Sequence, residues 1–289
     1  MACYVGSLRE PKNRPDIERT YCQLRQCASY LVFNDYFTIE EQRLVKAHTC
    51  KQHLLCPFCA MRRSGKFVAL NLPKLQTIIN ENPSKIPAMI TLTVKNGESL
   101  PERFTHLKNA HKRLTQRRRD SLKGKSSSEW ANLAGGITSY EFTKADDGGW
   151  HPHIHCMALL NDYIDQKALS EEWHEITGDS FIVDVRKVRP GIDTGALDIV
   201  SALLEVCKYA LKFHDMTLPD TWHAYEVLRR RRLVNSFGIL RGVAVPDELL
   251  DDPLEGLPYL ERHYRFSTEK RAYDLLKITH SDDLPPVAV

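Results

Sequence analysis

Two segments of β-forming residues surround a short polar turn near the middle of the chain, and they restrict the fold more than any other feature. The first segment, GGITSYEFTK, covers residues 135–144, and the second covers residues 151–160. Between them lies the sequence DDGG at Asp146–Gly149, which is typical of a turn. The pattern predicts a β-hairpin, and therefore a sheet that is at least partly antiparallel.

The segments around this hairpin alternate between strand and helix patterns. Strands are expected at 86–96 and within DSFIVDVRKV, and helices at 101–123, 165–178, 195–214 and 220–232. A further helix is expected to start or to be interrupted near Pro73. The order β-α-β-β-α-β-α indicates the α+β class, with a mostly antiparallel central sheet and helices packed on it.

Composition sets broad limits on the class of protein. The chain of 289 residues is long enough to bury a large core, and its net charge of +3 permits an acidic partner without requiring one. The first twenty residues are polar, and no apolar run reaches the length of about 20 residues that spans a membrane. We therefore expect a protein without a membrane segment in an intracellular, reducing setting.

Half of the eight cysteines lie in one segment: Cys27, Cys50, Cys56 and Cys59. Such a cluster in an intracellular chain favours a metal site over disulfides, and four thiolates suit a closed, tetrahedral structural zinc site. His48 and His53 are alternative ligands in the same segment. A redox role for the C-x-x-C pair is less favoured because no thioredoxin-like βαβ pattern surrounds it.

Three histidines alternate along the second hairpin strand, at His151, His153 and His155. Residues i and i+2 of a strand point to the same face, so His153 and His155 can bind one ion together. If the turn centres near Asp147, Glu141 lies opposite His153 and shares that face. The hairpin thus predicts a metal site with two imidazoles and one carboxylate, although a His-x-His pair is also common without a metal.

A second set of reactive side chains lies in LLEVCKYALKF, residues 203–213. Glu205 and Tyr209 are four residues apart on the expected helix and therefore share a face, with Lys208 and Lys212 on its flank. A phenol with a pKa of about 10 needs a nearby cation to become a nucleophile, and a carboxylate can activate water. The same spacing is also common on ordinary amphipathic helices.

Basic residues gather at 62–66, 112–125 and 229–232. Such clusters are often only solvated surface, but three of them together favour contact with phosphates. The candidate contacts are Arg62, Arg63, Lys66, Arg117, Arg118 and Arg119.

Taken in order, these motifs resemble one family. ITLTVKN, WHPHIH, TGDSFIVDVRKV and EVCKYALK follow one another as in the replication initiators of small rolling-circle plasmids, which are one-tyrosine HUH endonucleases. HUH denotes two histidines around one bulky apolar residue, here His153, Ile154 and His155. CPFCAMRRSGK and RRLVNSFGILRG are similar to that family as well, so the resemblance extends from about Cys27 to Gly242.

This resemblance implies a fold and a reaction. The fold would be HUH/RRM-like, with Mn²⁺ or Mg²⁺ at the HUH site and Zn²⁺ at the cysteine module. The divalent ion would polarise a scissile phosphate, and Tyr209 would attack it to form a 5′-phosphotyrosine link and a free 3′-OH. Glu205 matches a glutamate linked to hydrolytic termination, and Lys208 or Lys212 would stabilise the phenolate or the phosphate. The assignment of Glu141 as the third metal ligand comes from the hairpin geometry alone and not from the resemblance.

The resemblance also implies partners and a division of the chain. The substrate would be plasmid origin DNA with a hairpin or single-stranded nick site, in a bacterial cytoplasm with a host helicase and a DNA polymerase. A homodimer is left open. We expect an N-terminal arm at 1–26, a zinc-binding module at 27–66, an HUH endonuclease domain at 67–245 and a C-terminal tail at 246–289.

Other classes remain open at this point. An HUH transposase is similar in motif order, although small ones lack such a cysteine module, and relaxases usually carry the tyrosine before the histidines. A metallohydrolase for small molecules would show no DNA requirement. A non-catalytic zinc-finger DNA-binding protein would not need Tyr209.

Overall fold

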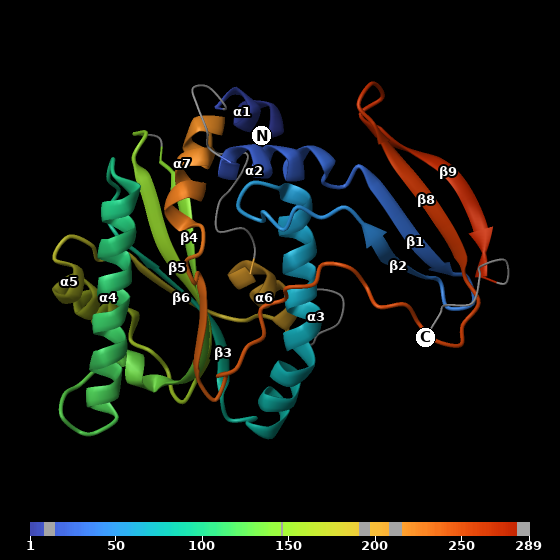
Figure 1. The fold of residues 1–289 in the computed structure, drawn as a ribbon. Coiled ribbons are helices and arrows are strands. Elements are labelled where there is room, and N and C mark those ends of the chain that lie inside the picture. The colour runs from blue at the N-terminus through green and yellow to red at the C-terminus, as the bar shows by residue number, and fades with distance from the viewer. Residues whose placement is uncertain (9–14, 146, 191–196, 208–215, 282–289) are drawn as a thin grey trace. The chain divides into compact units, whose positions relative to one another are not determined.

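The structure is a computed structural model that describes residues 1–8, 15–145, 147–190, 197–207 and 216–281. The chain divides into two compact units. The smaller unit combines Met1–Arg63 with Asp247–Val289, and the larger unit is Ser64–Pro246. Figure 1 shows the elements of both units.

A five-stranded antiparallel sheet forms the centre of the larger unit. Its strands are β3 (Ile86–Thr93), β4 (Leu133–Lys144), β5 (Trp150–Leu160), β6 (Val183–Lys187) and β7 (Val234–Gly238). Their order is β6-β3-β5-β4-β7, and each neighbouring pair is antiparallel. The prediction of an α+β fold with an antiparallel sheet is confirmed, and the strand that carries the histidines lies in the middle of the sheet.

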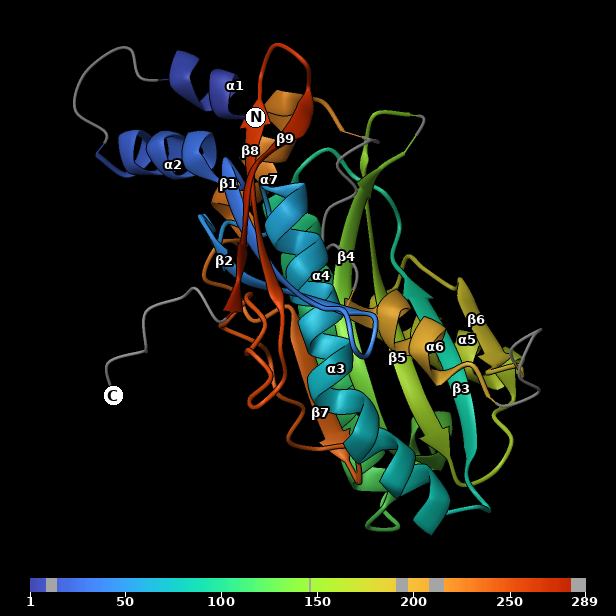
Figure 2. The same ribbon diagram turned by 90° about the vertical axis from the view of Figure 1, so that its right-hand side faces the viewer.

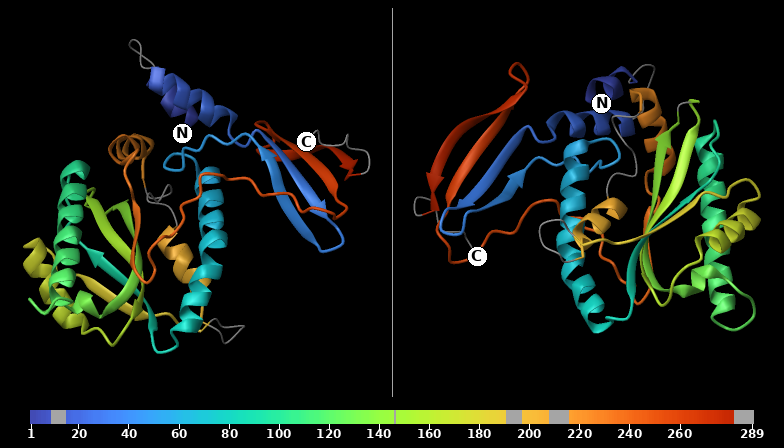
Figure 3. Two further views of the ribbon diagram at one scale, coloured as in Figure 1. Left: turned by 60° about the horizontal axis from the view of Figure 1, so that its bottom comes forward. Right: turned by 180° about the vertical axis from the view of Figure 1, so that it is seen from behind.

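Helices cover both faces of this sheet. They are α3 (Pro57–Glu81), which begins in the smaller unit, α4 (Leu100–Ser121), α5 (Gln166–Thr177), α6 (Ile199–Cys207), α7 (Leu218–Leu228) and the 3₁₀ turn η1 (Glu129–Asn132). Figures 2 and 3 show α4 and α5 on one face and α6 on the other. The predicted helix at 195–214 is described only as α6, because residues 208–215 lie outside the described residues.

Local sequence signals explain where these helices begin and end. Ser99 and Thr217 cap α4 and α7 by accepting a backbone N–H three residues later. Asp165 caps α5, and Gly178 ends it with a φ of 75° that suits glycine. Helix α7 ends at Leu228, so the four arginines at 229–232 follow the helix instead of closing it as predicted.

The alternation of the strands gives the sheet two different faces. On one face, Met157 and Leu159 of β5 pack against Phe67 of α3 and Leu203 of α6. His153 and His155 point to this same face because they precede Met157 by even steps. The histidines therefore lie where the apolar core under α6 gives way to polar side chains.

On the opposite face, aromatic side chains join the sheet to α4. Phe104 packs at ring-centroid distances of 6.0 Å from Tyr140 and 5.5 Å from Phe142. The Tyr140 hydroxyl is 2.8 Å from Nδ1 of His111, which is also buried. Aromatic packing and this buried contact therefore join α4 to this face of the sheet.

Helix α3 differs from the prediction, because it continues through Pro73 for 25 residues. Proline removes one helical hydrogen bond, at a typical cost of about 3 kcal/mol. Pro73 and Ala69, whose carbonyl loses its partner, are both exposed, so water can satisfy that carbonyl. The helix is held by apolar residues on its other side, among them Phe67 and Leu75.

The smaller unit contains a second antiparallel sheet. Its strands β1 (Tyr30–Tyr36), β2 (Glu41–Ala47), β8 (Leu260–Ser267) and β9 (Ala272–His280) are arranged in the order β2-β1-β8-β9. Two helices, α1 (Ala2–Ser7) and α2 (Pro15–Gln26), precede it. The expected N-terminal arm thus contains two helices, and the expected C-terminal tail contains β8 and β9. Strand β1 pairs with β8 from the far end of the chain. Within the described residues, every helix is too short or too polar to span a bilayer.

Candidate active site and metal centres

The hairpin register brings the predicted ligands together. Glu141 pairs directly with His153, as the turn length predicted, and Ser139 pairs with His155. Oε2 of Glu141 lies 2.9 Å from Nε2 of His155 and 3.4 Å from Nε2 of His153. The two imidazole rings are nearly perpendicular, with centroids 4.7 Å apart. One carboxylate oxygen thus faces two imidazole nitrogens.

This cluster is buried and electrostatically coupled. Glu141 is 2% exposed and His153 7% exposed. Burial disfavours the charged carboxylate, but hydrogen bonds from His153 and His155 outweigh burial and hold the pKa of Glu141 well below its ordinary value. The ionised carboxylate is therefore available as a metal ligand.

The donor set fits a divalent cation. One ligand atom from each of Glu141, His153 and His155 lies within 4.8 Å of the others. Two imidazoles and one carboxylate form a known type of three-residue site that leaves positions for other ligands. Mg²⁺ demands nearly ideal octahedral geometry and usually has oxygen ligands, so two imidazoles are an unusual set for it.

His151 lies beside the cluster but is not part of it. Its Nδ1 is 2.6 Å from Oδ1 of Asn96, and its ring centroid is 5.4 Å from that of His153. Backbone hydrogen bonds in both directions between Gly97 and Trp150 hold the Asn96 loop against β5. His151 is half-buried.

Helix α6 brings a second carboxylate to the histidines. Oε1 of Glu205 lies 3.7 Å from Nε2 of His155, and the Glu205 side chain is 40% exposed. The hydroxyl of Ser64 on α3 donates to the carbonyl of Cys207 at 2.8 Å, which fixes the end of the described part of α6. Tyr209, Lys208 and Lys212 lie outside the described residues.

The four clustered cysteines converge in the smaller unit. Sγ of Cys27 is 3.5 Å from Sγ of both Cys56 and Cys59, and Cys50 is 3.5 Å from Cys59. All four are free thiols. Zn–S bonds of about 2.3 Å give tetrahedral sulfur–sulfur distances of about 3.8 Å, so the cluster fits a zinc ion. Cys27 directly follows α2, Cys50 follows β2, Cys56 directly precedes α3, and Cys59 lies in the first turn of α3.

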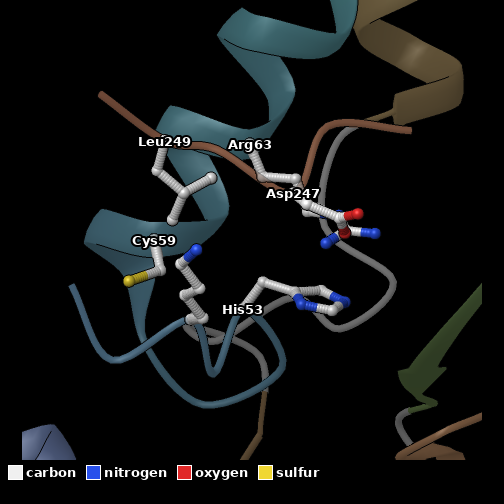
Figure 4. A pocket seen from close by; sticks show the side chains of 6 residues that line it. His53, Cys59, Arg63, Asp247 and Leu249 are labelled. Atoms are coloured by element: carbon white, nitrogen blue, oxygen red, sulfur yellow. The ribbon is translucent and has the colours of Figure 1, made fainter. Parts of the chain in front are cut away.

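A cavity of about 170 Å³ lies beside this cluster (Figure 4). It is lined by Lys51, His53, Cys59, Arg63, Asp247 and Leu249. Burial and the charge of Arg63 lower the pKa of His53 to about 4. His53 is therefore neutral at pH 7, and the group of residues that can hold the metal contains the four cysteines without His53 or His48.

The basic residues near the cysteines have different surroundings. Arg62 binds Oδ1 of Asp251 at 2.9 Å and donates to the carbonyl of Leu249 at 2.9 Å. Because Asp251 also accepts the backbone N–H of Leu44, Arg62 ties three segments together. Arg63 lines the cavity, and Lys66 is half-buried. The hydrogen bonds of Arg62 give it a structural role.

The basic residues of α4 also differ. Arg117 pairs with Glu175 at 2.8 Å, while Arg118 donates to the carbonyl of Leu133 at 2.7 Å and lies over the ring of Phe237 at 5.1 Å. Arg119 is exposed. Sequence spacing could not separate these roles, because they depend on partners from other elements.

Comparison with known proteins identifies the family. Residues 41–273 match the profile of a family described as replication protein, Rep_1. The chain is 30% identical over 207 residues to Protein rep of Staphylococcus aureus, covering 66% of this chain and 82% of that protein. It is 29% identical over 184 residues to Protein rep of Streptococcus pneumoniae serotype 2, covering 59% and 53%. It is 27% identical over 212 residues to Protein rep of Lactiplantibacillus plantarum, covering 68% and 63%.

The family match covers most of the chain and defines its class as a replication protein. The chain belongs to the Rep_1 replication protein family, and the resemblance of its motifs to plasmid replication initiators is thereby confirmed. The matched region spans most of the Staphylococcus aureus relative but little more than half of the Streptococcus pneumoniae one. No solved structure matches the chain at a significant level.

Proposed function

We propose that this protein initiates rolling-circle replication by nicking one strand at the double-strand origin of a plasmid. The observation that carries the proposal is the buried cluster of Glu141, His153 and His155 with Glu205 at its edge. The family match supports DNA replication over a small-molecule hydrolase, because the relatives are replication proteins. The enzyme would be a nicking and joining endonuclease of the HUH class.

Glu141, His153 and His155 would hold Mn²⁺ or Mg²⁺. The ion, when bound, would withdraw electron density from the scissile phosphate. Glu141 neutralises part of the added charge, and its burial keeps water from competing for its oxygens.

Tyr209 is the proposed nucleophile. Its phenolate oxygen would form a bond to phosphorus while the bond from phosphorus to the 3′ oxygen breaks, leaving a 5′-phosphotyrosine link and a free 3′-OH. Lys208 and Lys212 would stabilise the phenolate or the phosphate by their charge. A host polymerase would extend the 3′-OH, and a host helicase would open the duplex.

Glu205 is the proposed base for termination. Its carboxylate is partly exposed and lies at the edge of the metal cluster, where water can reach it. It would take a proton from the water that hydrolyses the last phosphotyrosine bond. One tyrosine and one carboxylate would then suffice for the strand transfer to Tyr209 and for the final hydrolysis.

The cysteine cluster would hold a structural Zn²⁺ and contribute folding free energy to the smaller unit. All six basic residues named above remain proposed DNA contacts. The exposed Arg119 is better placed for such a contact than Arg62, Arg117 and Arg118. The guanidinium groups of Arg62 and Arg118 already contact backbone carbonyls of the protein, and that of Arg117 pairs with Glu175.

The test uses labelled single-stranded oligonucleotides that tile the leading-strand origin of the parent replicon. Wild-type protein should cut one oligonucleotide at one position with Mn²⁺ and not with EDTA. His153→Ala should abolish cutting, whereas His174→Ala on the exposed side of α5 should not. Cutting that persists in His153→Ala with EDTA would exclude the proposed reaction.

A further inference from the structure

We infer that Thr91 is a positioning residue that fixes the imidazole of His155 for metal binding. The inference rests on the proposed metal role of the histidine cluster and adds a residue outside the HUH motif of His153, Ile154 and His155. Thr91 belongs to β3, the neighbour of the histidine strand on the side away from Glu141.

The register of β3 and β5 places one threonine opposite each histidine. Thr91 pairs with His155, and Thr93 pairs with His153. Directly paired residues share a face of the sheet, so both threonines point toward the cluster. Within the described residues, Thr91 is the threonine whose hydroxyl contacts its paired histidine: its Oγ1 lies 3.2 Å from Nδ1 of His155.

His155 is therefore held at both ring nitrogens. Nδ1 faces Thr91 on β3, and Nε2 faces Oε2 of Glu141 on β4 at 2.9 Å. By contrast, Nδ1 of His153 is buried and has no hydrogen-bond partner among the described residues. The orientation of His155 is set by two strands, and that of His153 by one.

A hydroxyl suits this position in both states of the site. Without metal, Nε2 of His155 must donate to the carboxylate, and Nδ1 of the neutral ring accepts from the Thr91 hydroxyl. With metal, Nε2 offers its lone pair to the ion, and Nδ1–H donates to the same hydroxyl. Valine, which has the same shape but no hydroxyl, can do neither.

The β-branched side chain adds rigidity. Threonine has few χ1 rotamers, and on a central strand its rotamer is limited further by its neighbours. The hydroxyl is therefore held close to its partner before any metal binds. Removing such a partner of a metal-binding histidine typically weakens metal affinity by about 10-fold to 100-fold.

The test measures Mn²⁺ affinity of the full-length protein without DNA, from the electron paramagnetic resonance signal of free Mn²⁺. Thr91→Val should weaken affinity at least about 10-fold, and Thr91→Ser should restore it to within about threefold of wild type. Thr93→Val is the matched control, on the same strand and face but without the contact, and should bind as wild type does. Circular dichroism confirms that each variant is folded.

The outcomes separate this inference from the proposed function. Wild-type affinity in Thr91→Val, or equal losses in Thr91→Val and Thr93→Val, would overturn the positioning role and leave the metal site intact. A failure of Thr91→Ser to recover affinity would also overturn it, because the hydroxyl would not be the active feature. If wild type and His153→Ala bind Mn²⁺ equally, the metal site itself fails, and the inference with it.

Discussion

Glu205 and His155 are brought together from a helix and a strand, with 3.7 Å between Oε1 and Nε2. The contact joins the two motifs that sequence spacing treats as separate, because α6 packs over the face of β5 that carries the histidines. It places a partly exposed carboxylate next to a buried, largely solvent-free cluster. This arrangement suits the proposed role of Glu205 as a base that acts on water at the edge of the proposed metal site.

Replacing Glu205 should separate the two halves of the proposed reaction. Glu205→Gln should leave the first nick within about threefold of wild type but slow release of the linked strand by about 100-fold, the usual range for loss of a general base. A time course of covalent adduct and free strand measures both steps. Glu171→Gln, an exposed carboxylate on α5, serves as the control. Loss of the first nick would instead assign Glu205 to placing the nucleophile or the metal.

The cysteine cluster should bind one zinc ion per chain and stabilise the fold. Cys56→Ser should lose the zinc and lower the unfolding temperature, because metal binding free energy is folding free energy at such sites. Cys22→Ser, an exposed cysteine outside the cluster, should change neither property. Metal analysis and thermal unfolding check this. Full zinc content in Cys56→Ser would show that the cluster is not the site.

Replacing Arg62 should lower stability, whereas replacing Arg119 should weaken DNA binding. Arg62→Ala removes hydrogen bonds to Asp251 and Leu249 and should cost about 1 to 2 kcal/mol of unfolding free energy. Arg119→Ala should leave stability unchanged but reduce the salt dependence of single-stranded DNA binding by about 0.7 in slope. Urea unfolding and fluorescence anisotropy at several salt concentrations measure these effects. Equal stability losses in both variants would contradict the assignment.

The buried His111 should make stability depend on pH. Burial lowers its pKa to about 4 in the folded protein, while the unfolded value is near 6.5. As pH falls from 6.5 to 4, the unfolded chain binds a proton that the folded chain does not, so stability falls, by about 3 kcal/mol in total. Urea unfolding of metal-free protein at pH 7 and pH 5 measures the loss.

His111→Gln removes this titration but keeps a polar partner for the Tyr140 hydroxyl. Because this titration is absent, the variant should lose less stability than wild type between pH 7 and pH 5. His53, whose pKa is also lowered to about 4, is present in both proteins. Its contribution to the pH dependence of stability therefore cancels when the two proteins are compared. An identical pH dependence in the two proteins would show that His111 does not titrate in this range.

The parts of the fold that sequence predicted are those fixed by local signals. The hairpin around Asp147 has turn residues and strand alternation, and its length alone determines that Glu141 meets His153. The helices expected at 101–123 and 165–178 lie within two residues of α4 and α5, where Ser99 caps the start of α4 and Gly178 ends α5. These features depend on residues within a few positions of one another, so the sequence reveals them directly.

The parts that sequence did not predict depend on distant partners. Strand β9 is exposed along most of its length, so it lacks the apolar alternation that marks a strand. Strand β1 becomes part of a sheet by pairing with β8 from the other end of the chain. The support that Thr91 gives to His155 also requires a register that only the folded sheet defines. The prediction that Glu205 and Tyr209 share one face of a helix concerns Tyr209, which lies outside the described residues.

The central claim is that Tyr209 forms a covalent bond to the 5′ end of the nicked strand. The most direct measurement incubates the protein with Mn²⁺ and the labelled origin oligonucleotide that it cuts, then maps the adduct by denaturing gel and peptide mass spectrometry. We predict an adduct on the peptide that contains Tyr209, absent in Tyr209→Phe and retained in Tyr163→Phe, an exposed tyrosine on the same unit. An adduct that survives Tyr209→Phe, or one that maps to another tyrosine, would contradict the account.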